Sequence, residues 1–285
     1  MDRSIANDPR EPEIAGQEVR ENSPSRQQQP RARSDGERPR PALQRPPREY
    51  RLNDSERETM AEISRFRTLS MEDLARERYH GSTAKMRQDV RQLSSQGLVQ
   101  TRSLWLGKEK DRLLVVTLTR KGKKVLEASG EQGTFYAGFV KPGEMVHDAA
   151  IYRMYQAEAA RIAKEGGQIR RITLDYELKR KVYSPLAKER PGSPEYKKRQ
   201  AEIAAQHGLK VVGGHIQLPD LRIEYRTRDG EIARADLELA TQHYRGGQLA
   251  AKADAGFKFY APTEDANRLR SVLDDHDITA EILWL

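Results

Sequence analysis

The chain has 285 residues, of which 36% are hydrophobic and 33% are charged, and it contains no cysteine. Because one domain takes about 150 residues, this length predicts two compact units and a tail. The lack of cysteine excludes disulfides and thiolate metal sites, and no apolar run approaches the roughly 18 residues of a membrane span. Residues 1–10 lack the apolar stretch of a signal peptide. We therefore expect a soluble cytoplasmic protein with no membrane partner.

Basic residues exceed acidic ones, with 51 Lys and Arg against 43 Asp and Glu and a formal net charge of +8. This balance favours a polyanionic partner. The first 50 residues hold eight of the 14 prolines and no lysine, and they have too few large apolar residues to offset the entropy of folding. We expect residues 1–50 to be a disordered Arg/Pro-rich tail. Its seven arginines between positions 26 and 48 either follow nucleic-acid phosphates or only keep the chain soluble.

Residues 51–130 show a regular succession of helix starts, turns and β-rich runs. N-cap residues at 53–55, at Ser70 and at Ser82 predict three helices, and Gly97 ends the third. The elements expected next are strands at 98–106 and 112–119, a polar tip at 107–111, and a short helix at 120–128. This order resembles a winged helix-turn-helix. The run Leu-Thr-Arg-Lys-Gly-Lys-Lys-Val-Leu at 118–126 also resembles the helix after the wing in bacterial winged-helix regulators.

The third helix, at 82–96, has the two faces that a DNA-reading helix needs. Met86, Val90 and Leu93 form an apolar stripe. Arginine and glutamine can read base edges, while lysine and serine suit phosphates. The candidate DNA-binding residues are Ser82, Lys85, Arg87, Gln88, Arg91 and Gln92 on this helix, with Lys108 and Lys110 at the wing tip. The alternatives are a solvated helix face and a winged helix that contacts proteins.

After a linker at 131–145, residues 146–285 predict a second, α/β unit. Its first helix, at 146–164, carries the stripe His147, Ile151, Met154, Glu158 and Ile162, in which the two polar residues read most simply as hydrogen-bonded core-edge groups. The other expected elements are a strand at 170–174, an irregular basic loop with no core role at 184–199, a helix at 199–207, a strand at 209–212, a helix at 264–275 and a strand at 280–285.

Two alternating runs, at 218–226 and 232–240, predict a β-hairpin around Arg228-Asp229-Gly230. A three-residue loop sets a register in which the apolar residues of the two runs face each other on one side and two charge-complementary pairs form on the other. The expected pairs are Leu221 with Leu237, Ile223 with Ala235, Tyr225 with Ala233, Arg222 with Asp236 and Glu224 with Arg234. A two-residue loop would mix the two faces.

The same register sets Asp220 opposite Glu238, and two like charges opposed in a sheet repel each other. Mg²⁺ or Mn²⁺ would relieve the repulsion, because both ions bind carboxylate oxygens, and such an ion can activate water for phosphodiester hydrolysis. The alternatives are one carboxyl group with a raised pKa, or an Asp220 that only caps the strand after Pro219.

Pro219-Asp220 followed by a hairpin to Glu238 resembles the metal site of PD-(D/E)xK, restriction-endonuclease-like nucleases. More narrowly, the chain resembles the bacterial replication-relaxation family of plasmids and other mobile elements. The features shared with that family are the winged helix, the helix near His147, Pro219-Asp220, Glu238, and a later helix with Lys252 near Phe257 and Tyr260. The resemblance implies an α+β protein, in which a winged helix-turn-helix precedes a nuclease-like domain with a central mixed sheet.

One position departs from the nuclease pattern, which places lysine two residues after the glutamate, where this chain has Ala240. Lys252 on the next helix and Gln242 on the same strand face are the candidate substitutes. The candidate catalytic residues are thus Asp220, Glu238, Lys252 and Gln242, with Asp220 and Glu238 as the metal ligands. Without a working substitute, the domain would bind DNA or serve a structural role without chemistry.

Three functions remain open from the sequence. The first is a DNA-binding accessory factor for plasmid replication or relaxation, or a transcriptional regulator, in the bacterial cytoplasm. Its expected partners are double-stranded DNA and relaxase or replication proteins, and it could form a homodimer. The second is a metal-dependent DNA endonuclease targeted by the winged helix, and the third is a protein adaptor.

Overall fold

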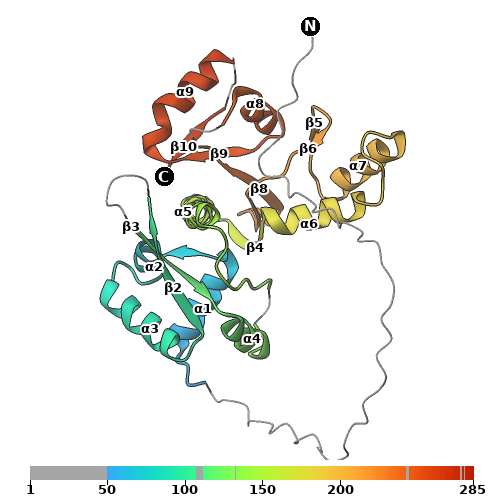
Figure 1. The fold of residues 1–285 in the computed structure, drawn as a ribbon. Helices are drawn as coiled ribbons and strands as arrows, with labels where there is room; N and C mark the ends of the chain where they lie inside the picture. Colours follow the sequence, from blue (N-terminus) through green and yellow to red (C-terminus); the bar gives the residue numbers. More distant parts are fainter. Residues whose placement is uncertain (1–49, 107–111, 132, 242–243, 277, 279) are drawn as a thin grey trace, which may run out of the picture. The chain divides into compact units, whose positions relative to one another are not determined.

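The computed structural model describes residues 50–106, 112–131, 133–241, 244–276, 278 and 280–285. The expected tail, apart from Tyr50, and the hairpin tip at 107–111 lie outside the described residues. The described part of the chain alternates helices with parallel and antiparallel strands, which makes it an α+β protein (Figure 1). This confirms the predicted fold class at that level. No helix in these ranges is long and apolar enough to cross a membrane.

Residues 50–130 contain the predicted order of three helices, a hairpin and a short helix. The elements are α1 (Asp54–Phe66), β1 (Leu69–Ser70), α2 (Met71–Arg78), α3 (Thr83–Ser95), β2 (Val99–Trp105), β3 (Arg112–Leu118) and α4 (Arg120–Ala128). The sequence did not predict β1, which pairs with β3 and completes a sheet in the order β1-β3-β2. A strand of two residues has no periodicity of its own, so only its partner defines it.

Two of the predicted helix caps form as expected. The Asn53 side chain accepts a hydrogen bond from the Glu56 amide at 2.8 Å, and the Glu56 carboxylate accepts one from the Asn53 amide at 3.0 Å. This reciprocal pair is a capping box. Ser70 accepts from the Asp73 amide at 3.2 Å at the start of α2. Ser82 occupies the N-cap position of α3, but within the described chain its side chain makes no capping hydrogen bond.

Residues beyond 130 form a longer succession of elements around a five-stranded sheet. They are α5 (Pro142–Lys164), β4 (Gln168–Leu174), α6 (Asp175–Leu186), α7 (Pro194–Gln206), β5 (Val211–Val212), β6 (His215–Ile216), β7 (Leu221–Arg226), β8 (Ile232–Leu239), α8 (Gly246–Asp254), β9 (Lys258–Ala261), a 3₁₀ turn at Thr263–Asp265, α9 (Ala266–Asp275) and β10 (Ile282–Trp284). The sheet order is β10-β9-β8-β7-β4. It is mixed, because β9 runs parallel to both β8 and β10, whereas β7 runs antiparallel to both β8 and β4.

The β7–β8 hairpin has the register that the sequence predicts. Leu221 lies opposite Leu237, Arg222 opposite Asp236 and Ile223 opposite Ala235. The Arg222 guanidinium donates to both Asp236 oxygens, at 2.6 and 2.9 Å. Gly230 has φ +87°, the left-handed conformation expected at the end of the loop.

The irregular loop expected at 184–199 is confined to 187–193, and both ends of the expected range are helical. Helix α6 continues through Leu186, and α7 already begins at Pro194, where Ser193 accepts a hydrogen bond from the Tyr196 amide at 3.1 Å. Proline is well suited to the first turn of a helix because its missing N–H would be unsatisfied there anyway. Leu186 is buried and Tyr196 packs beside it, so this segment does contribute to the core. The expected strand at 209–212 is limited to Val211–Val212.

Helix α5 begins at Pro142, four residues earlier than expected, and packs on both parts of the fold. Its Tyr152 and Tyr155 rings lie 5.0 and 4.9 Å from the ring of Phe66 in α1. Ile151 and Met154 belong to the same buried cluster as Leu221 and Leu237. The described chain is one compact unit from residue 49 onward. The predicted division at 51–130 and 146–285, with a linker at 131–145, stays a prediction.

Candidate functional site

Helix α3 separates its residues into a buried side and an exposed side, as the sequence predicts. Met86, Val90 and Leu93 are buried. The six candidate DNA-binding side chains on this helix are all exposed, namely Ser82, Lys85, Arg87, Gln88, Arg91 and Gln92. The exposed side therefore carries three cations, and the acid of this helix, Asp89, is turned inward.

Asp89 is an anchor that the sequence reasoning did not single out. Its carboxylate accepts hydrogen bonds from the Ser55 hydroxyl at 2.7 Å and from the Tyr79 hydroxyl at 3.0 Å. These bonds tie α3 to the start of α1 and the end of α2. A buried carboxylate that keeps its hydrogen bonds holds the helix in one orientation and leaves the exposed cations unopposed on their own side.

The predicted wing is a hairpin of β2 and β3, in which Trp105 lies opposite Arg112. The Arg112 guanidinium stacks over the Trp105 ring at 4.1 Å from the centroid, and this ring is 61% exposed. Lys108 and Lys110, the candidate DNA contacts at the wing tip, lie outside the described residues.

The two carboxylates of the hairpin meet, as the register requires. Glu238 Oε2 accepts a hydrogen bond from the Asp220 amide at 3.3 Å, and Asp220 Oδ2 accepts one from the Leu239 amide at 2.9 Å. Both side chains are buried, with 6% exposure at Asp220 and 0% at Glu238. Each carboxylate therefore reaches the backbone of the opposite strand.

Lys252, from α8, approaches the carboxylate of Glu238. Its Nζ lies 3.0 Å from Glu238 Oε2 and also donates to the Leu218 carbonyl. Ala240 is fully buried at the position where the nuclease pattern has lysine. Lys252 thus brings an ammonium group to the acid pair from another element, whereas Gln242 lies outside the described residues.

Two further side chains complete the cluster. The Tyr244 hydroxyl donates to Glu238 Oε1, and His147 Nε2 of α5 lies 3.6 Å from Asp220 Oδ2. The sequence predicts His147 to be a core-edge residue, and it does not identify Tyr244 as a hydrogen-bond donor to the acid pair. His147 lies four residues before the buried Ile151, which indicated the helix face that carries the imidazole. No local signal identified Asp220 as the partner of His147.

The pKa values in this cluster move in different directions. Burial, and then the charge of Asp220, raise the pKa of Glu238 to about 7. Burial also acts to raise the pKa of Asp220, but the contacts with His147, the charge of Lys252 and the Leu239 amide outweigh it and lower that pKa. Burial acts to lower the pKa of His147, but the Asp220 carboxylate outweighs it and raises that pKa. One acid thus holds its proton near neutral pH while its neighbour is ionised.

This arrangement changes the argument for a metal ion. The sequence predicts a metal ion that relieves the Asp220–Glu238 repulsion, but in the structure Lys252 and His147 bring positive charge to these acids. The Lys252 ammonium also occupies the Glu238 oxygens, so Mg²⁺ or Mn²⁺ does not fit between the carboxylates unless that ammonium leaves. Among the described residues, no three His, Asp or Glu side chains are grouped as metal ligands.

Glu158 behaves as the simpler interpretation expected. This fully buried carboxylate accepts hydrogen bonds from Arg161 at 2.5 and 2.9 Å, from Lys258 at 3.0 Å and from the Tyr260 hydroxyl at 2.7 Å. Both oxygens are satisfied by donors from α5 and β9. The group joins these two elements and offers no free position to a ligand.

Comparison with known proteins adds little to this geometry. No family model matches the sequence, and no curated protein matches it. Among solved structures, the crystal structure of Bacillus subtilis PadR in complex with operator DNA aligns with a TM-score of 0.24 and 13% identity, over 56% of this chain and 94% of that chain. At that score the alignment does not indicate a shared fold, so the functional argument depends on the residues themselves.

Proposed function

We propose that residues 51–130 form a winged helix-turn-helix that binds double-stranded DNA, with α3 in the major groove. The observation that carries this proposal is the division of α3 into a buried apolar stripe and an exposed face with Lys85, Arg87 and Arg91. The order of three helices followed by the β2–β3 hairpin supports it. In such domains the second helix of the pair reads base edges while neighbouring cations contact phosphates.

The test is selection of bound duplexes from a random-sequence library, followed by titration of the enriched site against a scrambled duplex. We expect Arg91→Gln to reduce the preference for the enriched site by about 1–3 kcal/mol, because arginine reads guanine through two hydrogen bonds. Lys85→Gln should weaken both duplexes evenly and reduce the salt slope by about one. Lys164→Gln, at the exposed end of α5, removes the same charge and should leave the preference unchanged. Equal affinity of the wild type for both duplexes would contradict specific recognition.

We place this DNA binding in a plasmid or another mobile element, where the chain acts as a replication or relaxation accessory factor or as a transcriptional regulator. The resemblance to the replication-relaxation family supports this role, and relaxase or replication proteins are the partners that it implies. The position of the selected site distinguishes the two roles. A site beside an origin of transfer or replication supports the accessory role, and a site within a promoter supports regulation.

A second candidate is a metal-dependent DNA endonuclease of the PD-(D/E)xK class. The observation that favours it is the meeting of Asp220, Glu238 and Lys252, two carboxylates and an ammonium group, beside a mixed sheet in which α8 connects the parallel strands β8 and β9. The position of the Lys252 ammonium on Glu238 weighs against it, since a bound Mg²⁺ or Mn²⁺ would need those oxygens.

Nicking of supercoiled plasmid in Mg²⁺ or Mn²⁺ tests the nuclease directly. If the proposal holds, wild-type protein nicks the plasmid, and Asp220→Asn or Glu238→Gln lowers the rate by about 10²-fold or more, as expected when a charged group at a reacting phosphate is removed. Lys258→Met, which changes a lysine on the separate Glu158 cluster, should retain the wild-type rate. Absence of nicking by the wild type, or equal nicking by all four proteins, would reject this function.

A further inference from the structure

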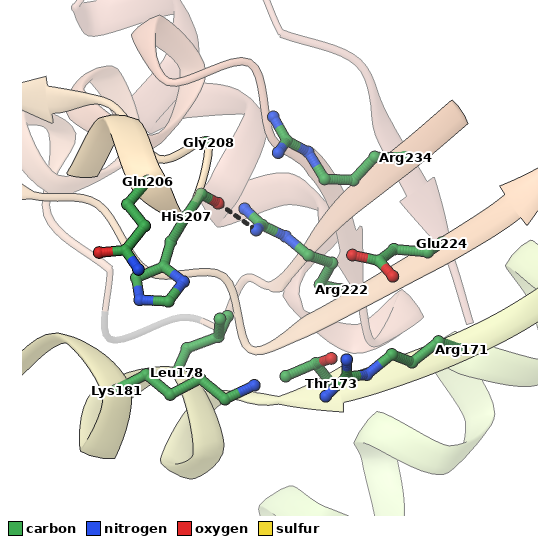
Figure 2. A pocket seen from close by; sticks show the side chains of 10 residues that line it. All are labelled: Arg171, Thr173, Leu178, Lys181, Gln206, His207, Gly208, Arg222, Glu224 and Arg234. Carbon is green, nitrogen blue, oxygen red and sulfur yellow. Dashed lines mark hydrogen bonds between the residues drawn. The ribbon is translucent and has the colours of Figure 1, made fainter. Parts of the chain in front are cut away.

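The polar face of the sheet carries a second cluster, separate from the acid pair. Side chains from β4, β7, β8, α6 and the end of α7 line a cavity of about 280 Å³. Figure 2 shows Lys181 of α6 and Arg222 of β7 directed into the space between the sheet and the two helices. Asp220, directly before β7, and Arg222 and Glu224 within it alternate along one face, so the cavity continues the surface on which the acid pair lies.

The charges around this cavity are unbalanced. Its lining contains four cations, Arg171, Lys181, Arg222 and Arg234, and one carboxylate, Glu224. Asp236 offsets part of the excess, because it binds Arg222 at 2.6 and 2.9 Å and lies 3.5 Å from Arg234.

Arg171 and Lys181 are the lining cations that lack an ion pair within 4.0 Å, although Glu224 lies opposite Arg171 in the β4–β7 register. Neither makes an ion pair with any residue that the structure describes. Even with Asp236 counted, the cavity keeps two positive charges more than negative ones.

Arg222 is held rigidly at the base of the cavity with donors to spare. Its side chain is 5% exposed, and its Nε, Nη2 and Nη1 atoms donate to Asp236 and to the His207 carbonyl, the last at 2.6 Å. A guanidinium group has five N–H donors, so two remain after these three bonds. A fixed arginine that has lost most of its rotamer freedom binds an anion at little further entropic cost.

The positive charge of the cavity affects the pKa of the His207 imidazole. Burial, and then the charges of Lys181 and Arg222, lower its pKa. Arg222 also has a structural role, because it donates a hydrogen bond to the His207 carbonyl at the C-terminal end of α7. At Gly208, with φ +58°, an added Cβ would lie 2.1 Å from Arg234 Nη1. That structural role involves Arg222 and Arg234 but neither Arg171, which faces Glu224 across the strands, nor Lys181.

We propose that this cavity binds a phosphate group through Arg171, Lys181 and the free donors of Arg222. A phosphate carries one to two negative charges and several acceptor oxygens, which match the two excess cations and the guanidinium donors. The phosphate comes either from the backbone of a nucleic-acid strand or from a free phosphate compound. The inference does not depend on the DNA-binding role of α3, since no α3 residue lines the cavity.

The test compares two double variants with equal loss of charge in the full chain. Arg171→Gln/Lys181→Gln removes the unpaired cations of the cavity. Arg170→Gln/Arg180→Gln removes their exposed sequence neighbours, which do not line it. Calorimetry with inorganic phosphate should give saturable binding to the wild type and the control, and at least about tenfold weaker binding to the cavity variant. NMR of His207 should show that phosphate raises its pKa in the wild type and not in the cavity variant.

A short single-stranded oligonucleotide forms the second arm. If the oligonucleotide shows the same dependence on Arg171 and Lys181 and binds more tightly than inorganic phosphate, the source is a nucleic-acid backbone. If only inorganic phosphate shows that dependence, the source is a free phosphate compound. If neither probe binds the wild type saturably, or if both double variants lose affinity equally, the cavity is not a phosphate site and the proposal is wrong.

Discussion

Replacing Lys252 with methionine is expected to lower the free energy of unfolding by about 3–5 kcal/mol, the usual effect of removing one partner of a buried ion pair. The Lys252 side chain is 16% exposed, and its Nζ lies 3.0 Å from a Glu238 carboxylate with no exposure. Methionine fills a similar volume but supplies no charge or donor. Among the described residues, the loss would leave Glu238 beside Asp220 with the Tyr244 hydroxyl and the Asp220 amide as its donors.

Chemical denaturation at pH 7.5 measures this effect, with Lys258→Met as the matched control. Lys258 also bonds a fully buried glutamate, but Glu158 keeps Arg161 and Tyr260 when this lysine is lost, and the Lys258 side chain is 41% exposed. We expect the control to lose about 1 kcal/mol or less. Adding Glu238→Gln to Lys252→Met should restore part of the stability. Equal losses in the two single variants would contradict the role of Lys252 as the counter-charge of the acid pair.

The second large effect is a pH dependence that belongs to Glu238. Its pKa rises from 4.5 to about 7 on folding, so the folded chain holds this proton more tightly than the unfolded chain. The stabilisation from this group is complete below pH 4.5 and is lost as pH rises toward and above 7. Glu238→Gln cannot lose a proton. Relative to the wild type, this variant should therefore gain about 3 kcal/mol between pH 4.5 and pH 8.

Glu158→Gln provides a control of opposite sign. Burial acts to raise the pKa of Glu158, but the bonds from Arg161, Tyr260 and Lys258 outweigh it and lower that pKa. The stability that Glu158 contributes is present above its unfolded pKa and is lost as pH falls through the folded value. Glu158→Gln should therefore be most harmful at neutral pH and less so in acid. Urea denaturation measures the two trends, with Glu238→Gln compared with wild type from pH 4.5 to 8 and Glu158→Gln compared with wild type from neutral pH to below pH 4.5. Parallel curves for Glu238→Gln and wild type would refute the shift.

Some features of the candidate sites follow from short-range rules. The hairpin register depends on a three-residue loop and a side-chain period of two, so Asp220 and Glu238 were expected to meet before any contact was known. The two faces of α3 follow from a helical period of 3.6, which placed Met86 inside and Arg91 outside. The caps at Asn53 and Ser70 depend on residues three positions apart.

Other features depend on where the chain turns, and short-range rules predicted them poorly. The segment 184–199 contains Pro185, Pro191 and Pro194, and its composition is typical of a loop. In the structure Pro194 lies in the first turn of α7, a position that tolerates proline, whereas Pro185 lies inside α6, which ends one residue later at Leu186. Burial of Leu186 against the neighbouring helix decides in favour of helix there.

The sequence by itself determined that two acids would face each other across a hairpin and that one basic helix would carry an apolar stripe. Only the tertiary structure decided how those acids are surrounded, because His147 comes from α5, several elements before the hairpin, and the contact of Lys252 with Glu238 depends on how the next helix, α8, packs. The cavity of Arg171, Lys181 and Arg222 has the same origin, since three separate elements bring its charges together. Periodicity and turn length act over a few residues, whereas the pairing of buried charges depends on how whole elements pack.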